Sequence, residues 1–208
     1  STPSSMSFHE LYWVLLTSFT NEAESDLSVM LEHYASEYFR IVSKTVKEYM
    51  PNHMYLGARL ASWGMTPEIR AAAAKHTDVM SYNVYKESIH PQFWGFLKDI
   101  DMPSIIGEFH MGSHDTGLFN PGLIMGEDQT DRARLYTTYM NSVVDNPYFV
   151  GAHWFQYLDS PVTGRAYDGE NYNVGFVSVA DVPYIPMIEA AKKFNQKIYT
   201  RRYPHTEK

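Results

Sequence analysis

The sequence has no cysteine among its 208 residues, which excludes disulfide bonds, thiolate metal sites and cysteine nucleophiles. No apolar run approaches the roughly 20 residues that a membrane-spanning helix requires, and the N-terminal residues show no secretory signal peptide. The chain begins with Ser1, and its first methionine is Met6. We therefore expect a processed product or a fragment of a longer protein.

Positive charge is also scarce. The chain has 17 Lys and Arg residues against 24 Asp and Glu residues, which gives a formal net charge of −7. Adjacent arginines, Arg201-Arg202, lie near the C-terminal end of the chain. Nucleic acids and anionic membranes bind to clustered positive charge, so the charge pattern argues against both partners.

The composition is that of a single globular domain. Hydrophobic residues make up 44% of the chain and charged residues 20%, and neither an internal repeat nor a low-complexity linker divides it. We expect one domain over residues 1–208, in which a helical lead-in at 1–50 precedes four β/α units at 51–208.

Apolar residues in the lead-in recur every three or four positions, which is the spacing of a helix. One such run covers 8–19, and a second covers 27–45, between a polar opening at 21–26 and the helix-breaking Pro51. Two helices are therefore predicted, of which the second is long and amphipathic.

Beyond residue 50, short apolar runs alternate with helical patterns. The predicted strands are 54–60, 78–85, 104–109 and 149–157, and the predicted helices are 66–75, 91–97, 130–145 and 184–197. Loops rich in polar residues, glycine and proline follow the last two strands, at 112–126 and 159–181.

Strands that are each followed by a helix form a parallel sheet, either doubly wound or part of an eightfold barrel. No glycine-rich phosphate loop follows any strand, so the nucleotide-binding open sheet lacks its signature. Polar side chains instead gather near the C-terminal ends of the strands, where barrel active sites are built. We expect an α/β fold of the TIM type, a (β/α)8 barrel of which four units are present. Four strands leave two edges unpaired, so a complementary segment or partner chain is expected.

Glu108 stands at the end of the apolar strand predicted at 104–109, where a carboxylate is costly unless it is paired or used. It is either the nucleophile of a retaining glycosidase or a buried salt-bridge partner, for example of Arg59. The first interpretation needs a second carboxyl group roughly 5 to 5.5 Å away. The position of Glu108 at a strand end favours this catalytic interpretation, and Arg59 would keep the carboxylate ionised.

Other polar residues near the strand ends are candidates for substrate binding. Asn83 would hold a sugar hydroxyl, and Tyr85 would hold the carboxylate of Glu108. His110 lies two residues after Glu108 and would point to the same side of the strand. The structural alternative for each is an ordinary hydrogen-bonded strand terminus.

The fourth strand and the loop after it add further candidates. Trp154 offers an apolar plane for the C–H face of a sugar, and Gln156 and Asp159 offer polar partners for its hydroxyls. The loop 168–173 lacks the spaced acidic ligands of calcium loops, so we expect Glu170 and Asn171 to contact sugar hydroxyls instead.

No metal or other cofactor is expected. His110, His114 and Asp115 are the nearest approach to a ligand set, but the glycine between them removes helical spacing. A closed metal site needs three or four convergent ligands, and the sequence does not supply them.

Five motifs are similar to those of a known family. They are LGAR at 56–59, SYNVY at 81–85, GEFH at 107–110, HWFQY at 153–157 and DGENYN at 168–173. Together they resemble the β-agarases of glycoside hydrolase family 50, over about residues 26–203. The resemblance implies a (β/α)8 barrel whose fifth to eighth strands are present here, with Glu108 as the nucleophile. It further implies retaining cleavage of β-1,4 linkages in agarose or its oligosaccharides, by an extracellular or periplasmic enzyme.

An acid/base carboxylate to match Glu108 is harder to find. In related clans it is the Glu of an Asn-Glu pair ending the fourth strand, and Asn21-Glu22 is the local candidate. The residues before this pair have helical spacing, and the family carries its acid/base residue further upstream, so Glu22 is interpreted as an acidic residue at a helix start. We expect the C-terminal half of a catalytic barrel, completed by an N-terminal half from the same precursor or from a second chain.

Two alternatives stay open. A catalytically incomplete half-barrel would bind galactan without cleaving it, and a related glycosidase would act on another galactan such as porphyran. The negative net charge favours a neutral agarose chain over a sulfated galactan as the substrate in the cleft.

Overall fold

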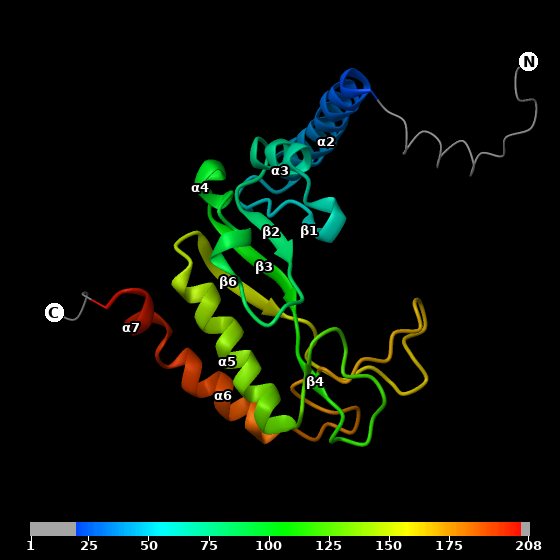
Figure 1. The fold of residues 1–208 in the computed structure, drawn as a ribbon, viewed down its shortest axis with the longest axis vertical. Coiled ribbons are helices and arrows are strands. Elements are labelled where there is room, and N and C mark those ends of the chain that lie inside the picture. Colours follow the sequence, from blue (N-terminus) through cyan, green and yellow to red (C-terminus); the bar gives the residue numbers. More distant parts are fainter. Residues whose placement is uncertain (1–19, 205–208) are drawn as a thin grey trace, which may run out of the picture.

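The computed structural model describes residues 20–204, and the helix predicted at 8–19 lies outside them. The described elements form a layer of helices against a parallel sheet (Figure 1). In chain order they are α2 (Asn21–Tyr49), β1 (Arg59–Ala61), η1 (Ser62–Gly64), α3 (Pro67–Ala74), β2 (Met80–Asn83), η2 (Pro91–Phe93), α4 (Leu97–Ile100), β3 (Ser104–Phe109), β4 (Gly112–Ser113), β5 (Met125–Gly126), α5 (Gln129–Asp145), β6 (Phe149–Trp154), α6 (Ile185–Asn195) and α7 (Ile198–Arg202). Among residues 20–204, no helix combines the length and apolar composition that crossing a membrane would take.

The main sheet has the strand order β1-β2-β3-β6, and all three pairings are parallel. The register aligns the side chains of the four strands in rows across the sheet. One row joins Leu60, Tyr82, Ile106 and Ala152. Leu60, Tyr82 and Ile106 are buried and belong to the same core cluster as residues of α3, α4 and α5. Because side chains alternate along a strand, the neighbouring rows with Arg59 and Asn83 face the other side.

Aromatic side chains fill much of the core between the sheet and the helices. The Phe109 ring stacks on Tyr139 of α5 with centroids 4.3 Å apart, and the hydroxyl of Tyr139 donates to the carbonyl of Val84 at 2.8 Å. Tyr82 lies edge-on to Trp94 at 5.0 Å. These contacts fix α5 across β2 and β3, the two strands whose ends carry the candidate site.

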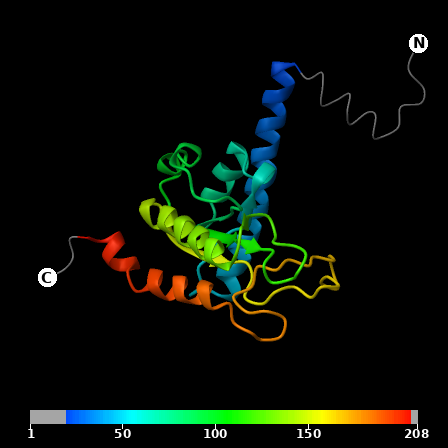
Figure 2. The same ribbon diagram turned by 60° about the horizontal axis from the view of Figure 1, so that its bottom comes forward.

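Helix α2 has two apolar sides, of which one is covered. Thr20 caps its start, because the side-chain oxygen accepts from the backbone N–H of Ala23 at 3.3 Å. Ala35 and Phe39 are buried on the side that packs against α3. A second stripe at heptad-like spacing is exposed, and its members are Leu27, Leu31, Tyr34, Tyr38 and Ile41. Figure 2 shows the N-terminal part of α2 extending beyond the rest of the molecule.

Several predicted boundaries were wrong. The first strand was expected at 54–60 with Arg59 at its end, but β1 covers Arg59–Ala61 and begins at that residue. Gly57 has a φ of 68°, which interrupts the extended chain before it. The last strand ends at Trp154 instead of 157, and the final bond of its ladder to β3 runs from the backbone N–H of Phe155 to the carbonyl of Phe109.

The predicted helix at 91–97 is split, with a 3-10 turn at Pro91–Phe93 and the short helix α4 at Leu97–Ile100. The loop at 112–126 contains a small parallel pair, β4 with β5, and α7 was not predicted. By contrast, β3 has the predicted bounds, and α3 and α5 begin and end within one residue of the predicted positions.

Candidate active site

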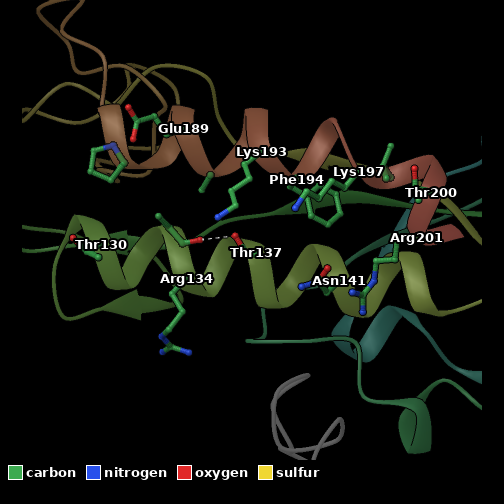
Figure 3. Close-up of a pocket in the computed structure, with 14 residues that line it drawn as sticks. Thr130, Arg134, Thr137, Asn141, Glu189, Lys193, Phe194, Lys197, Thr200 and Arg201 are labelled. Carbon is green, nitrogen blue, oxygen red and sulfur yellow. Dashed lines mark hydrogen bonds between the residues drawn. The ribbon is translucent and has the colours of Figure 1, made fainter. Parts of the chain in front are cut away.

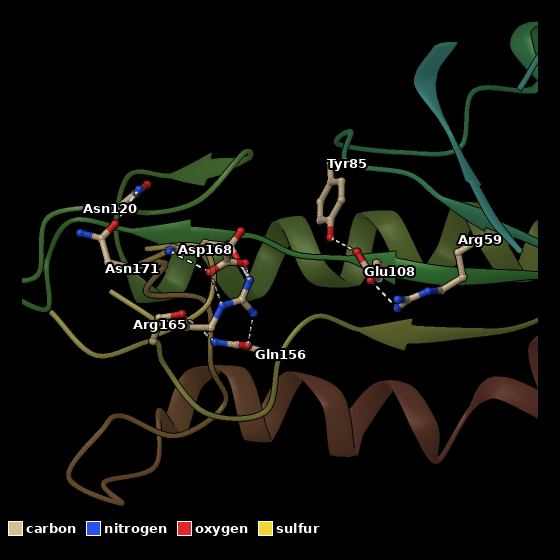
Figure 4. A network of polar contacts seen from close by, with 10 residues as sticks. Arg59, Tyr85, Glu108, Asn120, Gln156, Arg165, Asp168 and Asn171 are labelled. Atoms are coloured by element: carbon tan, nitrogen blue, oxygen red, sulfur yellow. Dashed lines mark hydrogen bonds and ion pairs between the residues drawn. The ribbon is translucent and has the colours of Figure 1, made fainter. Parts of the chain in front are cut away.

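Glu108 lies at the end of β3 and is held by two donors, one on each carboxylate oxygen. The hydroxyl of Tyr85 donates to Oε2 at 2.5 Å, and the guanidinium of Arg59 forms an ion pair with Oε1 (Figure 4). Fourteen per cent of the Glu108 side chain is exposed, against 58% for Arg59. The two donors therefore fix the orientation of the carboxylate, and part of the Glu108 side chain stays accessible to solvent.

Three adjacent strands bring these groups together. The register pairs Ala61 of β1 with Asn83 of β2, and Asn83 with Glu108 of β3, after a shift of one residue between Tyr82 and Asn83. The backbone N–H of Val84 then donates to the carbonyl of Glu108 at 2.9 Å, which holds the chain of Tyr85 beside the strand end.

Asn83 is the register partner of Glu108, and its side chain offers an unused acceptor. The Oδ1 atom is buried and has no hydrogen-bond partner among the described residues. A buried amide oxygen without a partner is costly. Asn83 thus keeps an unsatisfied amide oxygen directly beside Glu108.

Tyr85 links Glu108 to His110. The two rings lie 4.6 Å apart, and burial raises the pKa of the Tyr85 hydroxyl well above its usual range, with the bond to Glu108 acting in the same direction. His110 is fully buried, and its Nε2 accepts from the backbone N–H of Leu123 at 2.9 Å. Burial lowers the pKa of His110 to about 4, so the ring is neutral at ordinary pH, with its proton on Nδ1. His110 therefore packs against Tyr85, and its hydrogen bond with Leu123 holds the loop between β4 and β5. The sequence had instead predicted a direct contact between His110 and a sugar.

Trp154 is partly buried and packs edge-on against aromatic residues of the core. Its ring lies 5.1 Å from that of Phe109 and 5.3 Å from that of Phe176, and its Nε1 donates to the carbonyl of Val174 at 2.8 Å. The indole therefore packs between the sheet and the loop after β6. Part of the ring stays exposed, and the stacking on a sugar that the sequence predicted for it stays a prediction.

The loop after β6 is organised by Arg165, a residue that the sequence did not single out. Its guanidinium donates to Asp168 Oδ2 at 2.7 Å and to Gln156 Oε1 at 3.3 Å, and it forms an ion pair with Glu170 (Figure 4). The Phe155–Gln156 peptide bond is cis. Gln156 and Glu170 are thus brought together around the guanidinium of Arg165, and the sugar contacts predicted for them stay predictions. The recurrence of acidic residues three and five positions after Arg165 was the available signal.

Asn171 belongs to the same loop, and it accepts a hydrogen bond at Oδ1 from Asn120 Nδ2 at 3.1 Å. Asn120 comes from the loop between β4 and β5, so this contact joins the two long loops. Figure 4 shows the pair at one end of the network and Glu108 with Arg59 at the other.

Asp159 is buried, and both of its carboxylate oxygens accept hydrogen bonds from protein groups. It accepts from the backbone N–H of Gly175 at Oδ1 and from the hydroxyl of Tyr184 at Oδ2, each at 2.7 Å. Nearby Arg132 of α5 is fully buried, and it donates to the carbonyls of Met111 at 2.7 Å and Gly175 at 2.6 Å. Burial lowers the pKa of Arg132 to about 10, against the opposing effect of the Asp159 charge. Nothing in the sequence marked this arginine as buried.

Potential metal ligands do not converge in the part of the chain that the structure describes, since no group of three or more His, Asp or Glu there could hold an ion. Asp115 accepts from the hydroxyl of Ser113 at 2.7 Å and from the backbone N–H of Gln129 at 2.9 Å. Glu22 lies in the first turn of α2, fully exposed, at the end of the molecule remote from β3 (Figure 1). Its place next to the Thr20 cap is that of an acid favoured by a helix start.

Comparison with known proteins finds no matching family model, but it finds close relatives. "Beta-agarase B" of Vibrio sp. (strain JT0107) is 59% identical over 181 residues, which is 86% of this chain and 19% of that protein. The solved structure of an exo-β-agarase is 58% identical with a TM-score of 0.88, and the match covers 91% of this chain and 26% of that one. The structure of PfGH50B is 60% identical with a TM-score of 0.86, over 88% and 26% of the two chains. The chain thus spans about a fifth of the length of the curated relatives that it matches.

Proposed function

Since this chain is homologous to a segment of the β-agarases, we propose that it supplies part of the catalytic domain of a glycoside hydrolase that cleaves the β-1,4 linkages of agarose or its oligosaccharides. The observation that carries the proposal is the arrangement of Glu108 between Arg59 and Tyr85. A carboxylate that two donors orient at a strand end suits attack on a sugar ring placed above the sheet.

The proposed reaction is a double displacement. A carboxylate oxygen of Glu108 attacks the anomeric carbon while an acid/base residue protonates the departing glycosidic oxygen. The resulting glycosyl ester is then hydrolysed by water, whose proton passes to the same acid/base residue, and the anomeric configuration is retained. Arg59 and Tyr85 hold the carboxylate aligned for the first step, and Asn83 binds a hydroxyl of the sugar.

The acid/base carboxylate is proposed to come from outside residues 20–204. Three observations support a complementary segment. β1 and β6 are the edges of the main sheet, with a partner on one side only among the described strands. The exposed stripe of α2 leaves large apolar side chains in solvent, with Tyr34 78% and Tyr38 53% exposed. The relatives are also several times longer than this chain.

We propose that this segment completes a (β/α)8 barrel in which β1, β2, β3 and β6 are the fifth to eighth strands, and in which residues 51–208 are the last four β/α units. Within that barrel Gln156, Glu170 and Asn171 would lie in the loops above the sheet and contact sugar hydroxyls. Trp154 would offer the exposed part of its ring to a sugar, and the buried His110 and Asp159 would position these groups without touching the substrate. The reaction is placed outside the cytoplasm, where a polysaccharide is accessible.

The test is made on the longer protein that carries this segment. Glu108→Gln should reduce agarose hydrolysis by at least about a thousandfold while oligosaccharide binding persists, because the amide keeps the shape but cannot form the ester. Proton NMR of the first product should show the same anomeric configuration as the substrate. Inversion of configuration, or full activity of the variant, would exclude the mechanism. Binding by the 208-residue chain without hydrolysis would agree with a missing acid/base residue.

A further inference from the structure

A groove runs between α5 and α6 on the helical layer, away from the strand ends that carry Glu108. Its volume is about 970 Å³, which is at the upper end of the range for ligand sites. The α5 wall extends from Thr130 to Asn141, a length of about 16 Å at the rise of an α-helix. Figure 3 shows the two helices side by side with the lining side chains between them. The groove is therefore long enough for an extended chain.

Two lysines point into this groove. Figure 3 shows the ammonium groups of Lys193 on α6 and of Lys197, which directly precedes α7, reaching into the space that faces α5. Neither forms an ion pair with a described residue, whereas Arg201 at the end of the groove is paired with Asp145 and Arg134 with Asp131. The two ammonium groups carry like charges that repel each other at short range. An anion between them would remove that repulsion.

The rest of the lining is mostly small and uncharged, apart from the ion-paired Arg134 and Arg201 and from Glu189, which lies one turn before Lys193 on α6. Ala133 and Ala190 form part of the floor, and Thr137 and Asn141 place a hydroxyl and an amide along it. The large apolar residue Phe194 is itself buried, with its ring 6.3 Å from that of Tyr136. The floor thus offers hydrogen-bonding groups but no deep apolar pocket of the kind that anchors a peptide side chain.

We propose that this groove is an ancillary binding site for a sulfated galactan chain, separate from the cleft at Glu108. Sulfate esters along the chain would pair with Lys193 and Lys197, and sugar hydroxyls would bind Thr137 and Asn141. The choice of a galactan rests on the proposed function, whereas the preference for a sulfated polymer rests on the two unpaired lysines and the length of the groove. Two unpaired lysines against one glutamate, Glu189, leave the groove positive, whereas the whole chain has a net charge of −7.

The experiment measures binding of the 208-residue chain to a soluble sulfated galactan, to neutral agaro-oligosaccharides and to polyglutamate, by isothermal titration calorimetry at low and moderate salt. Lys193→Glu/Lys197→Glu should bind the sulfated galactan at least about tenfold more weakly, and Lys193→Gln/Lys197→Gln should be intermediate. Lys192→Glu is the matched control, since Lys192 is exposed on the same helix but does not line the groove. Its binding should change by less than about threefold.

An equal loss in the Lys192 control and the double variant would overturn the proposal, because it would show attraction by charge alone. Failure of the unaltered chain to bind the sulfated galactan would also overturn it. Binding of polyglutamate as tight as that of the galactan would assign the groove to an acidic peptide instead. Loss of agarose hydrolysis in Glu108→Gln is measured separately, so a failure of the proposed function is distinguishable from a failure of this site.

Discussion

Gly107 lies directly against the aliphatic stem of Arg59. A Cβ atom at Gly107 would come within 2.8 Å of both Cγ and Cδ of Arg59, and within 2.8 Å of Ser81 Oγ. The absence of a side chain on β3 therefore lets Arg59 cross the face of β2 and reach the carboxylate of Glu108. The glycine of the GEFH motif is explained by this crossing.

Gly107→Ala should displace Arg59 and reduce kcat/KM for agarose by roughly tenfold to a hundredfold in the longer protein, because small misplacements of aligned groups are costly. The matched control is Gly151→Ala on β6, where a Cβ would meet only Ile105 at 3.5 Å, an ordinary contact. Steady-state kinetics and thermal unfolding of both variants make the comparison. Equal activity of the two variants would remove the role given to Gly107.

Tyr85→Phe removes the hydroxyl that donates to Glu108 Oε2 at 2.5 Å but keeps the ring beside His110. A hydrogen bond to a charged group contributes about 1.5 to 3 kcal/mol, so kcat should fall by roughly ten- to a hundredfold. Tyr167→Phe, at a residue that is 78% exposed, is the control. An unchanged kcat in Tyr85→Phe would show that Arg59 alone orients the carboxylate.

His110 should make stability depend on pH. Burial lowers its pKa from the ordinary 6.5 to about 4, so between these values the unfolded chain binds a proton that the folded chain does not. The free energy of unfolding should therefore rise with pH across the window from about 4 to 6.5, by up to about 3 kcal/mol at 1.4 kcal/mol for each pKa unit.

Urea unfolding at several pH values measures this slope. It should be shallower in His110→Gln and unchanged in His53→Gln, a substitution at an exposed histidine. Retention of the full slope in His110→Gln would assign the pH dependence to other groups.

Arg132→Met should lower the free energy of unfolding by about 3 to 5 kcal/mol, because it leaves the buried Asp159 without its cation and strips two backbone carbonyls of donors. Arg134→Met, on the same helix but exposed, should cost no more than about 1 kcal/mol. Chemical denaturation with a check for two-state behaviour compares them. Similar losses in the two variants would mean that Arg132 is not the anchor that its contacts indicate.

The exposed stripe of α2 is expected to contact the complementary segment. Tyr34→Ser/Tyr38→Ser should weaken association of the 208-residue chain with that segment by at least about tenfold, since each lost aromatic contact removes apolar burial. The stability of the chain alone should change little. Lys44→Ser, on another face of α2, is the control in a pull-down or sedimentation assay. Equal association of both variants would place the contact elsewhere.

Local patterns in the sequence predicted most of the fold. The apolar run of β3 and the helical spacing of α3 and α5 gave their positions to within one residue, because length, periodicity and capping residues are encoded nearby. The contact of Tyr85 with Glu108 was also anticipated and is confirmed. Where a predicted boundary was wrong, the cause was a backbone conformation or a contact distant in the sequence, such as the positive φ of Gly57 before β1.

The burial of polar residues was not predictable in the same way. Arg132 has the sequence signature of an exposed helical residue, yet it is fully buried, because carbonyls from two loops distant in sequence accept its hydrogen bonds. His110 was expected to face substrate, but it is fully buried against Tyr85. Whether a polar side chain is exposed or buried depends on contacts with residues that are distant in the sequence, and the spacing of residue types does not predict those contacts.

The sequence by itself determined the alternation of strands and helices, the position of Glu108 at the end of β3, and the similarity to the β-agarases. Only the tertiary structure decided which donors reach Glu108 and which cations stay unpaired between α5 and α6. The physical reason is that propensity and periodicity act between neighbours along the chain, whereas hydrogen bonds and ion pairs form between residues that the parallel register and helix packing bring together.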